Sequence, residues 1–358
     1  MLKLGVLICA LLLTTCDVES SALTEQEKKA VMEMTTDMKS RCIGRYLIDF
    51  PVNAHPVGNA KFDGVGVNSK IMSLEKFEKD MLHREAELKK TRSTLGYQFL
   101  FDVGTVRGLE NTKYFISLGD PAASSDAKRV IEVYKWDRGY RLGFQMQAVD
   151  WTNSKFGNAS IVKNDPVKTN VPKQMQIAFD LITKLQGRAE DDIPTEPGVC
   201  FTGGFMPGKA ISESEEVSTS YVLADKADVS FSWKSFANLQ ATSTLLPRVR
   251  SSEVQDALKA AQGRVIRSGS VELPSGMKVD EVLTSALTLV EVPGHHGSLE
   301  TNYQGSPQSP YIVFDMLTAS PNFMTEAHTI KQSSLTEGEA VALWGAVSRS
   351  LRPRPNGF

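Results

Sequence analysis

The spacing of apolar residues predicts two amphipathic helices in the first half of the chain. Charged residues separate the apolar positions of the first helix, which follow the helical period over about five turns. These positions are Leu74, Phe77, Met81 and Leu88. A second apolar series stops before a glycine, as helices often do, and consists of Val171, Met175, Ala178, Ile182 and Leu185.

Segments rich in β-branched and aromatic residues lie before and between these helices and predict strands. Residues 42–50 form the first strand and residues 65–70 the second. Asp137-Arg138-Gly139 is typical of a hairpin turn between two further strands. The strands predicted between the two helices are residues 97–106, 113–118, 129–136 and 140–148.

The second half of the chain repeats this order of elements. Residues 199–206 are predicted to form a strand, a short helix is capped by Ser252, and a final helix is capped by Thr336. The other strands predicted in this half are residues 217–224, 229–233, 264–273, 277–287, 299–303 and 310–319. The pattern predicts an α+β fold with two domains of similar plan, each an antiparallel sheet with helices packed on one face.

The length of 358 residues also favours two domains, because it is long for one core. Residues 188–198 are charged and contain prolines, as connections between domains often do. We therefore place an N-terminal domain at residues 41–190 and a C-terminal domain at residues 197–352. Residues 17–40 are expected to form a tether that contains a helix, because a capping box begins at Thr24.

Residues 1–16 resemble the signal peptide of a bacterial lipoprotein. A positive charge precedes an apolar run of about ten residues, which is too short to span a bilayer. The segment ends at Cys16, which would be retained in the mature protein and lipidated; the alternative is an ordinary signal peptide cut near Ala22. Asp17 resembles a signal for retention at the inner membrane. We therefore expect a periplasmic protein that is lipid-anchored to the inner membrane.

The chain has four cysteines, of which two are expected to reach the folded protein as thiols or a disulfide. Cys9 is removed with the apolar run, and Cys16 is the lipidation site. Cys42 and Cys200 then remain in an oxidising compartment, which favours a disulfide between them. The alternative is two buried free thiols. The bond would join the first strands of the two domains and restrict their relative motion.

The chain lacks the sequence patterns of common catalytic and cofactor sites. It has no nucleophile elbow, phosphate loop, HExxH motif or dinucleotide-binding glycine pattern. Gly203-Gly204 is not followed by a helix, so we expect it to allow a bulge or close backbone packing. The net charge is −2 with both signs mixed along the chain, which excludes a nucleic-acid-binding stripe.

The remaining polar candidates favour a solvated surface. His295-His296 lies among prolines and glycines typical of a turn, and no further ligands stand at a useful spacing for a metal. Glu190, Asp191 and Glu215 lie in polar connections and are expected to be exposed. We therefore expect no catalytic, cofactor-binding or metal-binding residue.

Two cysteine-centred segments resemble the two-domain immunity proteins cognate to lipase effectors of the bacterial type VI secretion system. They are Cys42-Ile43-Gly44-Arg45-Tyr46-Leu47-Ile48-Asp49-Phe50-Pro51 and Pro197-Gly198-Val199-Cys200-Phe201-Thr202-Gly203-Gly204-Phe205. The likeness extends from about Arg41 to Leu351. It implies a protein without enzymatic activity or cofactor, whose two α+β domains clamp a phospholipase toxin and keep it from opening to its substrate. The implied partner is the secreted lipase, and the membrane is reached only through the lipid anchor.

The resemblance carries no motif for the interface, so the residues that bind the partner are unknown at this point. Exposed loops at residues 119–128 and 293–310 are candidates. Two other functions stay open. The protein could be an envelope lipoprotein that acts as a scaffold or ligand-binding module, or a periplasmic enzyme of unrecognised type. An enzyme would show a deep pocket with ionisable residues.

Overall fold

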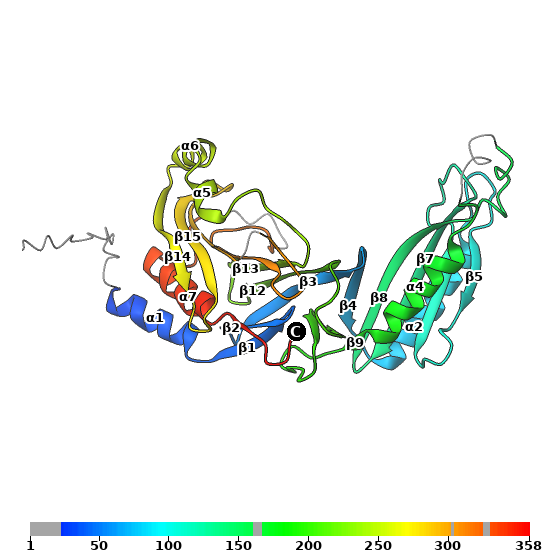
Figure 1. Ribbon diagram of the computed structural model, residues 1–358, viewed down its shortest axis with the longest axis horizontal. Coiled ribbons are helices and arrows are strands. Elements are labelled where there is room, and N and C mark those ends of the chain that lie inside the picture. The colour runs from blue at the N-terminus through cyan, green and yellow to red at the C-terminus, as the bar shows by residue number, and fades with distance from the viewer. Residues whose placement is uncertain (1–22, 160–166, 302–303, 325–329) are drawn as a thin grey trace, which may run out of the picture.

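The chain folds into two lobes that diverge from a common base and give it the shape of a V (Figure 1). The computed structural model describes residues 23–159, 167–301, 304–324 and 330–358. Residues 65–185 form one lobe, which we call the arm, and residues 23–62 and 186–358 form the other, which we call the body. The predicted lipidation site, Cys16, lies outside the described residues.

The arm consists of a strongly paired antiparallel sheet and two long helices. In chain order its elements are β4 (Val65–Ile71), α2 (Leu74–Lys90), β5 (Leu100–Gly104), β6 (Thr112–Ser117), β7 (Lys128–Asp137), β8 (Tyr140–Val149) and α4 (Val171–Lys184). Across the sheet the strand order is β4-β8-β7-β6-β5. Both predicted helices and the predicted hairpin between β7 and β8 are confirmed.

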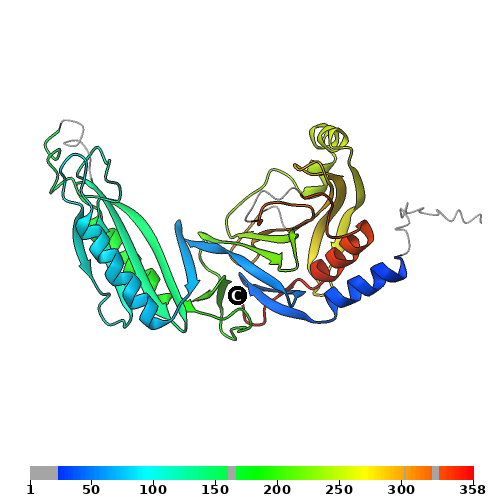
Figure 2. The ribbon, with the colours of Figure 1, turned by 180° about the vertical axis from the view of Figure 1, so that it is seen from behind.

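The two helices of the arm cover opposite faces of its sheet. Phe115 in β6 belongs to the apolar cluster with Phe77 and Met81 of α2, whereas its neighbour Ile116 belongs to the cluster with Ile182 of α4. Neighbouring residues in a strand point to opposite faces. The two views agree, since α4 lies in front of the sheet in Figure 1 and α2 in front of it in Figure 2. The expectation of helices on one face is therefore wrong for the arm, because its central strands are apolar on both sides.

The body contains the two ends of the chain. Its elements are α1 (Glu25–Thr35), β1 (Met38–Ile43), β2 (Tyr46–Pro51), β3 (Ala54–Phe62), β9 (Gln186–Gly187), β10 (Gly198–Phe201), β11 (Gly204–Pro207), β12 (Glu215–Leu223), β13 (Lys226–Phe236), α5 (Leu245–Val249), α6 (Ser252–Ala260), β14 (Arg264–Glu272), β15 (Lys278–Leu287), β16 (Pro293–Glu300), β17 (Tyr311–Leu317), α7 (Glu337–Arg349) and β18 (Arg352–Pro353). Its main strands follow the order β14-β15-β16-β17-β13-β12-β3, and the same sheet continues into the arm through β4.

Strand β3 links the two lobes but belongs to the body. It pairs with β12 along nine residues, from Ala54 to Phe62, and with β4 along only three, from Ala60 to Phe62. Residues 41–62 precede the arm in sequence, yet backbone pairing places them in the body. The proposed N-terminal domain, residues 41–190, therefore contributes strands to both lobes.

The two cysteine-centred segments form hairpins rather than single strands. Residues 42–50 include the turn between β1 and β2, where Gly44 has a φ of 57°. Residues 199–206 include the turn between β10 and β11, where Gly203 has a φ of 66°. Glycine adopts this left-handed conformation without a steric penalty. The continuous apolar pattern concealed both turns, because the strands on either side of each turn are buried.

Two further boundaries differ from the sequence prediction. The side chain of Ser251, not Ser252, accepts a hydrogen bond from the Val254 amide and caps α6. The strand predicted at residues 299–303 begins earlier, at Pro293. Its proline and glycines are typical of a turn, but pairing with β15 and β17 holds the segment extended.

Helix α1 is packed on the body rather than free. It lies beside α7, and both helices begin with a capping box. The box at Thr24 and the cap at Thr336 are as predicted. The Thr336 hydroxyl donates a hydrogen bond of 2.6 Å to the Glu27 carboxylate, which joins the two caps. The tether predicted at residues 17–40 therefore ends in a docked helix.

A buried carboxylate fastens α7 to the sheet of the body. Glu281 in β15 is fully buried and accepts hydrogen bonds from the Trp344 indole at 2.7 Å and from the Arg349 guanidinium at 2.8 Å. Arg267 forms a further bond to the same carboxylate at 3.1 Å. The ring of Trp344 stacks on Phe314 with centroids 5.4 Å apart. The polar contact thus fixes how α7 lies on the core.

Replacing Glu281 with alanine should destabilise the protein by about 3–5 kcal/mol, because the arginines and the indole lose their buried acceptor. Chemical denaturation with urea measures this free energy of unfolding. Glu272→Ala, on the exposed end of β14, is the matched control and should change stability by less than about 0.5 kcal/mol. Equal stability of the two variants would contradict the role of Glu281.

The same contact predicts a pH dependence. Burial by itself would raise the pKa of Glu281, but the Arg349 hydrogen bond and the Arg267 charge outweigh it and lower the pKa below its usual 4.5. A carboxylate whose pKa is lowered by folding stabilises the native state above its unfolded pKa and loses this effect as the pH falls. The stability gap between wild type and Glu281→Ala should therefore shrink as the pH drops below about 4.5.

Candidate partner-binding surface

Cys42 in β1 and Cys200 in β10 form a disulfide, with their Cα atoms 5.7 Å apart. Two backbone hydrogen bonds of 2.8 Å between Gly44 and Cys200 join the same strands. Both strands belong to the body, since the chain leaves for the arm after β3 and returns through β9. The bond therefore ties together the chain segments on either side of the arm. It joins residues of the two predicted domains, but it does not join the arm to the body, because β1 to β3 pack in the body.

Two buried arginines hold the charged connection at residues 188–198. The Arg188 guanidinium donates to the Asp192 carbonyl at 2.7 Å, and the Arg354 guanidinium donates to the Gly198 carbonyl at 2.7 Å. Burial, together with the charges of other arginines nearby, lowers the pKa of Arg354 to about 10, so it stays charged at neutral pH. The segment predicted as an interdomain connection is thus fixed by hydrogen bonds along its backbone.

A third buried arginine fastens the end of the chain to the same base. Arg45 makes two hydrogen bonds with the Glu215 carboxylate, at 3.0 and 2.8 Å, and donates to the Gly357 carbonyl at 2.6 Å. The ring of Phe358 packs edge-on against Tyr46 with centroids 5.5 Å apart. The last residues of the chain therefore help to hold the base of the V.

Glu190 and Glu215 are only partly exposed and bind buried groups, which corrects their predicted exposure to solvent, whereas Asp191 is exposed as predicted. The Glu190 carboxylate accepts a hydrogen bond of 3.0 Å from the Tyr221 hydroxyl, and burial and this carboxylate raise the pKa of Tyr221 well above its usual value. Asp191 accepts a hydrogen bond from Arg41, and Glu215 binds Arg45. The sequence could not show these partners, because they come from distant segments.

The two adjacent histidines lie in β16, not in a turn. His295 is buried, its Nδ1 lies 3.2 Å from the Thr318 hydroxyl, and burial lowers its pKa. His296 points to the opposite face, where its Nε2 lies 3.4 Å from the Asp315 carboxylate. Because the two rings point to opposite faces of one strand, they cannot bind the same metal. In the described parts of the chain, no cluster of three or more potential metal ligands occurs.

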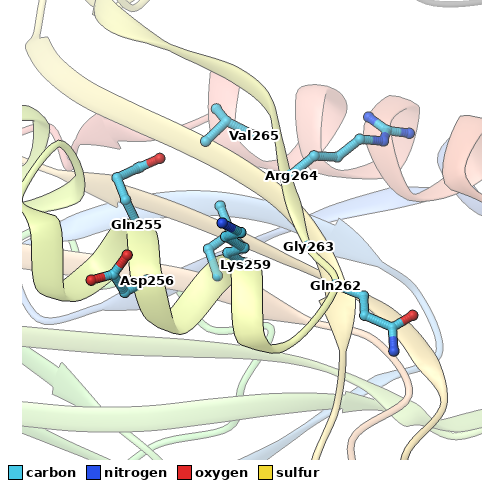
Figure 3. A pocket seen from close by; sticks show the side chains of 8 residues that line it. Gln255, Asp256, Lys259, Gln262, Gly263, Arg264 and Val265 are labelled. Atoms are coloured by element: carbon cyan, nitrogen blue, oxygen red, sulfur yellow. The ribbon is translucent and has the colours of Figure 1, made fainter.

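A hollow on the surface of the body lies between the end of α6 and the start of β14 (Figure 3). It is lined by Gln255, Asp256, Leu258, Lys259, Gln262, Gly263, Arg264 and Val265. This lining offers charges and amides but no serine, threonine, cysteine or histidine. Among the described helices, none is long and apolar enough to cross a membrane.

One side of the sheet of the body is polar and turned towards the inside of the V. In β13, Phe231 and Trp233 are buried in the core, while Ser232 and Lys234 point to the other side. Both views place α7 and the β1–β2 hairpin on the core side, away from the arm (Figures 1 and 2). We call the opposite side the inner face. Cross-strand pairing assigns to it Ser218, Ser220, Ser232, Lys234, His296, Ser298 and Asp315.

The two segments proposed as exposed interface loops differ in conformation. Residues 119–128 form a loop at the tip of the arm, where Asp126 accepts a hydrogen bond of 2.5 Å from Ser154. Residues 293–300 form the mostly buried strand β16, so the expectation of an exposed loop is wrong for this part of the second candidate. Strand pairing on both sides buries the segment despite its turn-like sequence.

Two exposed aliphatic residues on loops of the body were missed in the sequence. Ile211 is 78% exposed and Leu239 is 44% exposed. Their loops adjoin a third loop, because Gln308 donates to the Ala210 carbonyl at 2.7 Å and the Gly305 amide donates to the Leu239 carbonyl at 2.9 Å. Single exposed aliphatic residues are common. Only the tertiary contacts show that these two stand on adjoining loops.

Comparison with models of known protein families shows to which family the chain belongs. The model for the N-terminal domain of Tle cognate immunity protein 4 matches residues 39–188, and the model for its C-terminal domain matches residues 192–356. The chain belongs to the Tle cognate immunity protein 4 family. The resemblance drawn from the two cysteine-centred segments is thereby confirmed. No match is found among curated protein sequences.

Solved structures share the whole fold of this Tle cognate immunity protein 4 family member. The crystal structure of a Tle4–Tli4 complex contains a chain with 18% identity and a TM-score of 0.67, and the match covers 90% of this chain and 99% of that one. The apo immunity protein TplEi of the type VI secretion system from Pseudomonas aeruginosa has 18% identity and a TM-score of 0.65, with 89% and 98% covered. At such identity the likeness establishes a common fold.

Loss of the disulfide should destabilise this family member strongly. The bond closes a loop with a sequence separation of 158 residues, and the chain-entropy model assigns such a loop about 4–5 kcal/mol. The double variant Cys42→Ser/Cys200→Ser should therefore unfold at much lower urea concentration. Reduced wild type is the control and should match the variant. Free thiols in mass spectrometry of exported wild type would refute the bond.

Proposed function

We propose that the protein is a periplasmic immunity protein that binds a cognate type VI secretion lipase effector between its arm and body and thereby inhibits it. The observation that carries this proposal is the match of both family domains to a single chain with the shape of a V. A similar solved structure is described as a Tle4–Tli4 complex, which supports an effector as the partner. Inhibition by binding requires no catalytic residue in this chain.

The architecture suits a binding protein. A stable interface of ordinary size buries about 800 Å² on each partner, and two lobes offer an effector two surfaces instead of one. The disulfide and the buried arginines fix the base from which both lobes extend. A receptor that is ordered before binding loses less conformational entropy when the complex forms. The polar inner face and the exposed loops of the body supply hydrogen-bonding groups for recognition.

The proposed location follows from the targeting segment and the docked helix. If Cys16 carries the lipid, the chain from Cys16 to Leu23 can span at most about 25 Å. Helix α1 begins two residues later and packs on α7. The body would thus stay close to the membrane surface, where a lipase effector finds its substrate.

The purified protein should inhibit the lipase encoded beside its gene at a molar ratio of about one to one. Lys234→Glu, on the inner face, should raise the concentration needed for half inhibition about tenfold, because a reversed charge at a contact costs on the order of 1–2 kcal/mol. Lys29→Glu, on the outer helix α1, is the matched control and should leave inhibition unchanged. A fluorogenic lipase assay measures both.

Full lipase activity in the presence of excess wild-type protein would refute the proposed function. Equal inhibition by the Lys234→Glu and Lys29→Glu variants, with wild type inhibiting, would instead remove Lys234 from the interface.

Lipidation at Cys16 can be tested separately. Cells grown with a labelled fatty acid should label the wild type, and the protein should fractionate with membranes. The variant Cys16→Ser should carry no label and lose the membrane association, because the thiol is the acylation site. Cleavage near Ala22 with an unlabelled, soluble wild type would support the ordinary signal peptide instead.

A further inference from the structure

Strand β8 has a free edge inside the V. Its first half, Tyr140 to Phe144, pairs with β4, whereas its second half, Gln145 to Val149, pairs only with β7. Because β4 lies between β8 and the body in the strand order, the unpaired side of the second half points towards the body. Figures 1 and 2 show this half of β8 rising beyond β4 at the side of the arm that faces the body.

Backbone groups on this edge are ready to form hydrogen bonds. The Val149 amide donates to the Asn170 side chain at 2.8 Å, and the Val149 carbonyl accepts from the Asn170 amide at 3.1 Å. The backbone groups of Val149 therefore point away from β7. Since the direction alternates along a strand, those of Gln145 and Gln147 point the same way. Within the described residues they have no partner on that side, and both side chains are exposed.

Other free strand edges of the long sheet carry features that discourage pairing with another chain. The outer strand β14 has charged residues, including Arg264 and Arg267, and a shift in register. The outer strand β5 is five residues long and also has a register shift. The edge of β3 contains Pro56. Charges, bulges, short length and proline all protect strand edges.

The second half of β8 has neither charge, proline nor register shift to protect its edge. The segment Gln145-Met146-Gln147-Ala148-Val149 has no charge and no proline, and its pairing with β7 shows no register shift. An edge of this kind is a template for another strand. Its position inside the V restricts access to a molecule that enters between the lobes.

We propose that the β8 edge binds an extended segment of the cognate lipase by strand addition, so that the backbone of the effector continues the sheet of the arm. The inference rests on the proposed function for the identity of the partner. The amides and carbonyls of Gln145 and Gln147 supply up to four backbone hydrogen bonds, while alternating side chains along the added strand contact the neighbouring surface. The added segment must offer free backbone amides and carbonyls.

The variant Gln147→Pro tests this directly. Proline removes the outward amide and obstructs an added strand, yet it is compatible with an edge position because this amide does not bind β7. Gln147→Ala is the matched control, since it removes the side chain and keeps the backbone. Binding to the lipase, measured by calorimetry, should weaken about 10- to 100-fold for Gln147→Pro and less than about threefold for Gln147→Ala. Both variants should keep the thermal midpoint of wild type.

Wild-type affinity in the Gln147→Pro variant would overturn the inference, and so would an equal loss in both variants, which would assign the effect to the side chain. These outcomes are distinct from failure of the proposed function, in which wild type itself does not bind the lipase.

Amide hydrogen exchange gives a second measurement that does not depend on any variant. In the free protein the amides of Gln145 and Gln147 should exchange much faster than those of Met146 and Ala148, which face β7. The lipase should slow exchange at both glutamines. Equal protection in the free protein would mean that the edge is already covered. Analytical ultracentrifugation would then show whether a second copy of the chain occupies it, and either result would overturn the inference.

Discussion

The continuity of the sheet between the two lobes depends on a short stretch of backbone pairing between β3 and β4. β3 is bound to the body along its whole length through β12, but it meets the arm at only three residues. The ring of Phe62, at the end of β3, packs edge-on against Phe201 with centroids 5.8 Å apart. The core of the body therefore reaches the junction itself. Through this junction one sheet serves both lobes, while the outer parts of the lobes remain free to contact a partner.

The base beneath the junction supplies hydrogen-bond donors to the backbone carbonyl groups of residues 188–198. The chain must return from the arm through residues 188–198, and a buried irregular segment carries carbonyl groups that need donors. A guanidinium supplies five N–H donors in a fixed plane, and Arg188 and Arg354 direct theirs at these carbonyls. The disulfide between Cys42 and Cys200 closes the same region covalently. A polar cluster and one covalent bond thus hold this irregular segment in place.

This arrangement suits a protein that acts by binding a partner. The inner face is polar because alternate residues of its strands are turned away from the aromatic core, as Ser232 and Lys234 are beside Trp233. An arm with an unpaired strand edge stands opposite. Relatives with 18% identity share the fold along nearly their whole length, which fits a structure determined by apolar alternation and a few fixed contacts. The surfaces can then vary with the effector that each protein meets.

The sequence by itself determined the local elements whose signals are short-range. Helices α2, α4 and α7 follow from apolar spacing and caps, and the β7–β8 hairpin follows from Asp137-Arg138-Gly139. The pair of cysteines that remains after removal of the signal segment, in an oxidising compartment, pointed to a bond between Cys42 and Cys200. The segments around these cysteines carried the resemblance to the family. The α+β class needed no more than these periodic patterns.

Tertiary structure alone decided where the elements meet. Strand order placed residues 41–62 in the body, and pairing on both sides made residues 293–300 a buried strand. Glu190 and Glu215 are half-buried because Tyr221 and Arg45 reach them from other segments. Such contacts depend on which distant strands exchange hydrogen bonds, and a local pattern of apolar and polar residues carries no information about that choice.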